Sequence, residues 1–172
     1  MTAFTLFHTL VSVLPIGFGL YALVRNGKID PKARSGKWYL GTMLAGSVSS
    51  FGFIPVLGFT PGQVLTLMTI TLLAIGMFTL RGRWRTPGYT QTIALTTSFL
   101  MLMVFATTET LKRVPINHPL AVGPNDPSLI PVRIALLGIY LLFLGYQMLK
   151  IRSEHSPVAR LERLIAGYRH AA

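Results

Sequence analysis

The sequence predicts an all-α integral membrane protein, a bundle of five transmembrane helices with a short amphipathic interfacial helix at the C-terminus. Three observations lead to this prediction. Hydrophobic residues make up 51% of the 172 residues and charged residues only 12%, against roughly 25% in soluble domains. The apolar residues gather in five runs, each about as long as the ~20 residues that cross the ~30 Å core of a bilayer. The basic residues gather on alternate connections between these runs.

The five runs divide the chain into one transmembrane domain, residues 1–153, and a tail, residues 154–172. No polar stretch is long enough to fold as a separate domain. The first run has no basic segment before it and its charges follow it, which favours an uncleaved helix over a signal peptide. The predicted helices are Ala3–Val24, Trp38–Phe59, Pro61–Leu80, Gly88–Leu111 and Pro131–Lys150.

The distribution of charge predicts an orientation with the N-terminus outside and the C-terminus in the cytoplasm. All basic residues lie on the first connection, the third connection or the C-terminal segment from Lys150 onward, except Lys112, Arg113 and Arg133. Cytoplasmic connections carry the excess of basic residues in membrane proteins, and tryptophan and tyrosine gather at the interfaces. The predicted cytoplasmic aromatic belt comprises Trp38, Tyr39, Trp84, Tyr89 and Tyr146.

Small residues recur on one face of the predicted helix 38–59. Small side chains let neighbouring helices approach closely in a bilayer. We therefore expect this face to pack against another helix, and the alternative is that it lines a narrow polar cavity. The face consists of Thr42, Ala45, Gly46, Ser49 and Gly52.

Proline positions predict the connections on the outer side. Thr60 is suited to cap a helix that begins at Pro61. The segment Lys112–Ile130 contains repeated prolines, which exclude a helix or a central strand. We expect an ordered loop there.

The tail, residues 154–172, has apolar residues at helical spacing and basic residues that include Arg160 and Arg163. Such a helix is expected to lie on the inner leaflet, with its basic residues near anionic head groups. A helix that binds a protein partner is the alternative.

Two ionisable residues are predicted to lie inside the bilayer, His8 and Glu109, and both fall in the outer half of the membrane. His118, in the proline-rich loop, belongs to the same side. Ionisable residues inside a bilayer are costly and are therefore functional candidates. These three side chains could bind a divalent metal, a proton or a small ligand. Alternatively, Glu109 pairs with Lys112 and Arg113 on its own helix, and His8 bonds to a carbonyl group.

Most other chemistries find no support in the residues. The chain has no cysteine, no paired carboxylates within its spans, no phosphate-binding glycine loop and no nucleophile elbow, so no enzymatic activity is expected. A b-type haem needs two axial ligands, and His8 is the one histidine inside a span, so haem is not favoured. The net charge of +11 lies at the ends of the spans, which indicates lipid head groups as the partner rather than nucleic acid.

Several short motifs resemble a family of small bacterial multi-pass membrane proteins of unknown function. The motifs are His8, Gly17 and Leu20, the runs Arg25–Lys28 and Gly36–Tyr39, Met43, and the runs Thr108–Leu111 and Arg113–Pro115. The chain departs from the family at Lys32–Ser35, where such proteins often carry a histidine before the glycine. The resemblance implies a multi-pass architecture in the bacterial inner membrane and no particular activity.

The sequence thus leads to one principal functional hypothesis and two alternatives. The principal hypothesis is a non-enzymatic inner-membrane protein with an outer polar site for a metal, proton or small ligand. The first alternative is a structural subunit that docks onto itself or onto a larger membrane complex. The second is a membrane b-type haem protein.

Overall fold

The computed structural model describes residues 3–79, 87–115 and 119–154, and these residues contain helices and no strand. The main helices are α1 (Ala3–Asn26), α2 (Arg34–Ser50), α4 (Pro61–Phe78), α5 (Pro87–Leu111) and α6 (Ile130–Glu154), with short helices η1 (Phe51–Phe53), α3 (Ile54–Leu57) and η3 (Pro127–Leu129) between them. Five helical stretches within these residues are long and apolar enough to cross a membrane.

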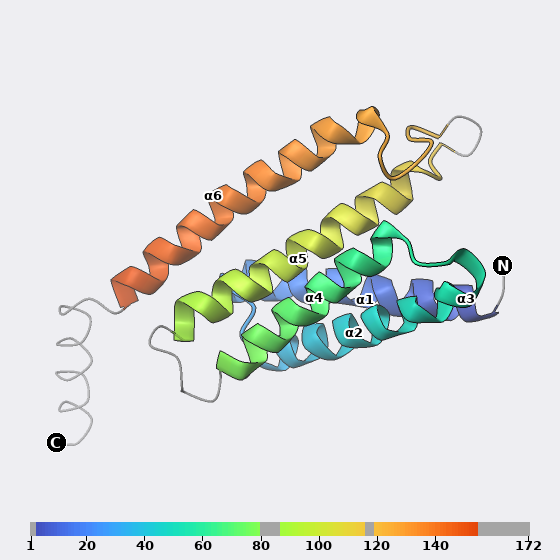
Figure 1. Ribbon diagram of the computed structural model, residues 1–172. Helices are drawn as coiled ribbons and strands as arrows, with labels where there is room; N and C mark the ends of the chain where they lie inside the picture. The colour runs from blue at the N-terminus through green and yellow to red at the C-terminus, as the bar shows by residue number, and fades with distance from the viewer. Residues whose placement is uncertain (1–2, 80–86, 116–118, 155–172) are drawn as a thin grey trace, which may run out of the picture.

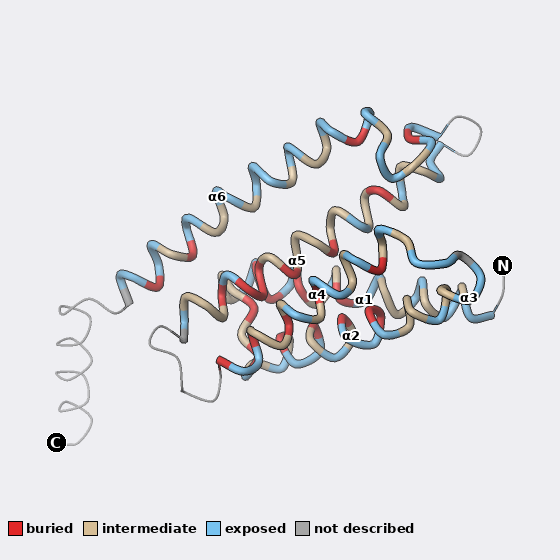
Figure 2. The backbone as a smooth tube through the Cα atoms, viewed as in Figure 1, coloured by how far each residue is buried: buried red, intermediate tan, exposed pale blue. Residues whose placement is uncertain are grey.

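The helices form an antiparallel bundle in which α1 packs on α2, α4 on α5, and α5 on α6. The N-terminus, α3 and the loop before α6 lie at one end, here called the N-terminal end, and the link from Gly27 to Ala33 lies at the other, here called the basic end (Figure 1). Buried residues line the inner faces of α1, α2, α4 and α5, whereas α6 is mostly exposed (Figure 2). Large apolar side chains cover the outside, with Leu142 and Val24 about four-fifths exposed, at 80% and 79%.

The second helix begins earlier than its predicted start at Trp38. α2 starts at Arg34 because Gly36 packs directly on the preceding turn, where a Cβ would lie 1.8 Å from the carbonyl oxygen of Asp30. The turn is held by the Ala33 N–H, which donates to the Asp30 carbonyl at 3.0 Å. The first connection is therefore shorter than its composition indicated.

The helix predicted from Trp38 to Phe59 is helical as far as Leu57, but its α-helical geometry is interrupted. α2 ends at Ser50 and is followed by η1 and α3. Pro55 explains the change, because it has no N–H to donate to Phe51 and its ring crowds that carbonyl. The stretch Arg34–Val56 still has the length and hydropathy of a membrane span. Gly58, with a φ of +70°, then turns the chain toward α4.

Tyr39 does not belong to the predicted aromatic belt. Its side chain is fully buried, and its hydroxyl lies 2.8 Å from the Ser98 hydroxyl. Successive residues of a helix point about 100° apart, so Trp38 faces outward, 53% exposed, while Tyr39 faces the core. Tyr89 is half-buried. Trp84, another residue of that belt, lies outside the described residues.

The connections at the N-terminal end use local hydrogen bonds. The backbone N–H of Thr60 donates to Gln63 Oε1 at 2.7 Å, so α4 begins at Pro61 as predicted. Before α6, the Asp126 carboxylate accepts from the backbone N–H groups of Val122 and Ser128, at 2.8 and 2.9 Å, and from the Ser128 hydroxyl. These donors hold the pKa of Asp126 below its ordinary value, and they order the described part of this loop.

The remaining boundaries differ slightly from the predicted ones. α1 continues to Asn26, and α6 runs from Ile130 to Glu154, past the predicted end at Lys150. The helix predicted for the tail, with Arg160 and Arg163, lies outside the described residues apart from Glu154, as does His118.

Candidate functional site: a polar cavity around His8

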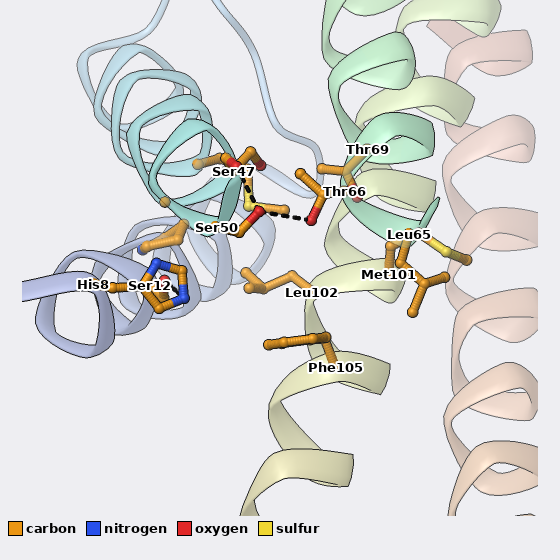
Figure 3. A pocket seen from close by; sticks show the side chains of 13 residues that line it. His8, Ser12, Ser47, Ser50, Leu65, Thr66, Thr69, Met101, Leu102 and Phe105 are labelled. Carbon is orange, nitrogen blue, oxygen red and sulfur yellow. Dashed lines mark hydrogen bonds between the residues drawn. The ribbon is translucent and has the colours of Figure 1, made fainter. Parts of the chain in front are cut away.

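A cavity of about 70 Å³ lies between α1, α2, α4 and α5, toward the N-terminal end of the bundle (Figure 3). It has room for a few water molecules. Its polar lining consists of one imidazole and five hydroxyl side chains: His8, Ser12, Ser47, Ser50, Thr66 and Thr69. Apolar side chains complete the wall: Pro15, Met43, Leu65, Met101, Leu102 and Phe105.

Helical spacing brings these polar groups to one place. His8 and Ser12 stand one turn apart on α1, and residues three or four apart share a helix face. Ser47 and Ser50 on α2 follow the same spacing, as do Thr66 and Thr69 on α4. Gly46 allows α1 to approach, because a Cβ there would lie 3.2 Å from Ser12 Oγ.

The hydrogen bonds around His8 favour one tautomer of its ring. Ser49 Oγ lies 2.9 Å from the carbonyl oxygen of Gly46, which accepts its only proton. While this bond is kept, the 2.8 Å contact between Ser49 Oγ and His8 Nδ1 needs Nδ1–H as the donor. The neutral ring then carries its lone pair on Nε2, which lies 3.5 Å from Ser12 Oγ. Nε2 is the atom available to a proton or a donor ligand.

The opposite wall also presents acceptors. Ser50 Oγ donates to the Ser47 carbonyl at 2.8 Å, and Thr66 Oγ1 donates to the Gly62 carbonyl at 3.0 Å. The two hydroxyl oxygens lie 3.2 Å apart, so neither has a second proton to offer the other while both backbone bonds are kept. Their lone pairs favour a hydrogen-bond donor in the cavity.

Aromatic rings close the cavity around the histidine. The His8 ring meets the Phe53 ring edge-on, with centroids 5.0 Å apart and an interplanar angle of 78°. Phe105 lies across the cavity on α5 (Figure 3). In these apolar surroundings each polar contact is stronger than it would be in water.

Glu109 has different partners from His8. Its carboxylate binds Lys112 Nζ at 2.9 Å and Arg113 Nη2 at 3.1 Å, so the pairing along its own helix is confirmed. Glu109 is not among the residues that line the cavity. Within residues 3–79, 87–115 and 119–154, no three His, Asp or Glu side chains come close enough to hold a metal ion. The predicted three-residue set remains a prediction, because His118 lies outside these ranges.

Three of the five predicted small residues pack on α1. Gly46 packs on Ser12, Ser49 binds His8, and in η1 a Cβ at Gly52 would lie 2.4 Å from the Phe4 ring. Thr42 returns its hydroxyl to the Trp38 carbonyl, and Ala45 is exposed. Gly46 also lines the cavity, so close packing and cavity lining coexist on this face.

Sequence reasoning missed four of the hydroxyl groups, Ser47, Ser50, Thr66 and Thr69. Their signal is the spacing of three between hydroxyl residues in both helices. Many such hydroxyls only bind their own helix backbone, as those of Thr71 and Thr110 do here. The pairs that face one another could be identified only after the helices were placed.

Comparisons of the chain with protein-family models, curated proteins and solved structures found no match. The resemblance to small bacterial multi-pass membrane proteins therefore remains a prediction.

Proposed function

We propose that the chain is a five-span integral protein of the bacterial inner membrane, with the N-terminus outside and the C-terminus in the cytoplasm. Its apolar exterior and five span-length helices support insertion. The described basic link between α1 and α2 supports the orientation, because basic connections stay in the cytoplasm. In this orientation the His8 cavity lies in the outer half of the bilayer.

The function that we propose for the cavity is non-enzymatic binding of a proton or a small hydrogen-bond donor from the outer side. The observation that carries this proposal is the set of inward-facing acceptors, His8 Nε2, Ser50 Oγ and Thr66 Oγ1. Protonation of Nε2 would turn the one titratable group of the lining into a cation. One imidazole among hydroxyls is a poor ligand set for a divalent metal, which prefers several imidazole, thiolate or carboxylate ligands.

Access from the outer side can be measured in this cysteine-free chain. We expect Ser50→Cys to react with a small membrane-impermeant thiol reagent added outside. The matched control is Ser98→Cys, because Ser98 is fully buried against Tyr39 and does not line the cavity. Equal reaction at both positions, or none at Ser50→Cys, would contradict an open polar cavity.

Proton binding has its own signature in the same variant. The cysteine is treated in turn with a cationic and a neutral thiol reagent, and the ratio of the two reaction rates is measured. Both rates depend equally on the ionisation of the thiol, so their ratio reports only the local charge. We expect this ratio to fall several-fold as the pH decreases through the titration of His8, since imidazolium repels the cation. In Ser50→Cys/His8→Gln the ratio should not change with pH. A rate ratio that still depends on pH in that double variant would contradict the proposed role of His8.

The two alternatives are separated by simple measurements. A cavity of about 70 Å³ does not accommodate a haem ring, and a Soret band in the purified protein would overturn this conclusion.

The docking-subunit alternative is favoured by one observation, the exposed apolar surface of α6, where Leu142 is 80% and Leu149 67% exposed. Native mass spectrometry would reveal a stable oligomer or complex.

A further inference from the structure

A second and larger cavity is an open groove of about 860 Å³ between α1 and the start of α2, on the basic end of the bundle. Along α1 its wall is apolar and includes Val13, Leu14 and Phe18. The part of the groove near the start of α2, here called its entrance, is lined by Arg25 and Arg34. The groove thus combines an apolar channel with a cationic entrance.

The groove has the length of one bilayer leaflet. Arg25 and Val13 are twelve residues apart on α1, or ~18 Å along its axis, and half of a ~30 Å core is ~15 Å. The channel is open beside Gly17, where a Cβ would meet nothing within 4 Å. Val13 and Leu14, 56% and 48% exposed, leave apolar surface uncovered along it.

The arginine side chains at the entrance are placed to bind an anion. Arg25 Nη1 donates to the Tyr21 hydroxyl at 2.7 Å, and the guanidinium lies 5.7 Å from the centre of the Tyr21 ring. These contacts hold Arg25 in place and leave other N–H groups free to donate. Among the described residues the recorded ion pairs all belong to Glu109, so neither Arg25 nor Arg34 has a carboxylate partner. Guanidinium groups bind phosphate through paired N–H donors.

An aromatic wall marks the level of the head groups. Trp38 is 53% exposed and stacks on Phe18, with ring centroids 5.8 Å apart and an interplanar angle of 18°. Tryptophan favours the membrane interface. The positive end of the α2 dipole, next to Arg34, adds to the attraction for an anion.

We propose that this groove binds one anionic phospholipid of the inner leaflet. Its phosphate lies between Arg25 and Arg34, and one acyl chain follows the Gly17 channel along α1. The proposal rests on the membrane insertion proposed above and is independent of the His8 cavity, which lies toward the other end of the bundle. A soluble phosphate ester would satisfy the arginines but would leave the apolar channel empty.

The test is native mass spectrometry of the full chain, purified with equal amounts of phosphatidylglycerol and phosphatidylcholine. We expect retained phosphatidylglycerol on the native protein and a loss of that preference by roughly tenfold in Arg25→Gln/Arg34→Gln. The matched control is Lys32→Gln/Lys37→Gln, which removes the same charge from exposed positions that do not line the groove. An equal loss in both double variants would overturn the proposal, because it would reduce the effect to net charge.

A second pair of variants tests the acyl channel. Gly17→Leu fills the channel without changing charge, and Gly41→Leu adds the same side chain to an exposed position of α2 that also meets nothing within 4 Å. Retained lipid should be lost in the first variant and kept in the second. Lipid retained equally by both, or displaced by added inorganic phosphate, would show that the channel holds no chain and would overturn the proposal.

Discussion

Replacement of Gly36 by alanine is expected to destabilise the protein by about 3 kcal/mol or more. The new Cβ would lie 1.8 Å from the Asp30 carbonyl oxygen and 2.6 Å from its carbon. The clash involves backbone, so it cannot be relieved by rotation of a side chain. The Asp30 turn is itself anchored by Ile29, which is buried in the core. The apparent melting temperature in detergent should therefore fall sharply.

Gly41→Ala is the matched control for this prediction. Gly41 lies in the same helix, is exposed, and has space for a Cβ. Alanine in a helix is favoured over glycine by about 0.5–1 kcal/mol, so this variant should be as stable as the native chain or slightly more stable. A similar melting temperature for both variants would contradict the packing of α2 on the Asp30 turn.

Replacement of Gln147 by leucine is expected to cost about 2 kcal/mol. Gln147 is 2% exposed, and its amide joins three elements of the fold. Nε2 donates to the Gly27 carbonyl at 2.8 Å, and Oε1 accepts from Thr96 Oγ1 at 2.9 Å. Leucine would leave the buried Thr96 hydroxyl and the half-buried Gly27 carbonyl without this bond, and it would loosen α6 from α5 and from the link after α1.

Tyr140→Phe is the comparison for Gln147→Leu. The Thr97 hydroxyl donates to the Ile93 carbonyl at 2.7 Å, and the Tyr140 hydroxyl can donate to Thr97. Removal of the Tyr140 hydroxyl therefore leaves no hydrogen-bond donor without a partner. We expect a smaller fall in the apparent melting temperature than for Gln147→Leu. The reverse order would argue that α6 is held by its outer contacts and not by the buried amide.

Hydropathy was sufficient to predict the five span-length apolar helices, because a bilayer demands a continuous apolar length. The start of α4 followed from Thr60 and Pro61, whose local chemistry decides the boundary. The early start of α2 could not be predicted in the same way. It depends on a contact between Gly36 and the Asp30 turn, and a contact of this kind is visible only in three dimensions.

The candidate site, like the fold, could be predicted only in part from the sequence. His8 was identified from sequence because an ionisable residue inside a span is costly. Its hydroxyl partners come from other helices, and hydroxyl residues are common in this chain. Tyr39 was assigned to the interface by its position along the chain, whereas its direction around the helix axis places it in the core. Rotation about the axis depends on packing, which the hydropathy of the chain does not describe.

The central claim is that five helices cross a membrane with the His8 cavity on the outer side. Single cysteines at Asn125 and Lys32 test it directly, because both residues are exposed, they lie at opposite ends of the bundle, and the native chain has no cysteine. In intact spheroplasts, an impermeant maleimide should label Asn125→Cys at once and Lys32→Cys only after permeabilisation. Labelling of both in intact spheroplasts, or of Lys32→Cys alone, would contradict the proposed membrane topology.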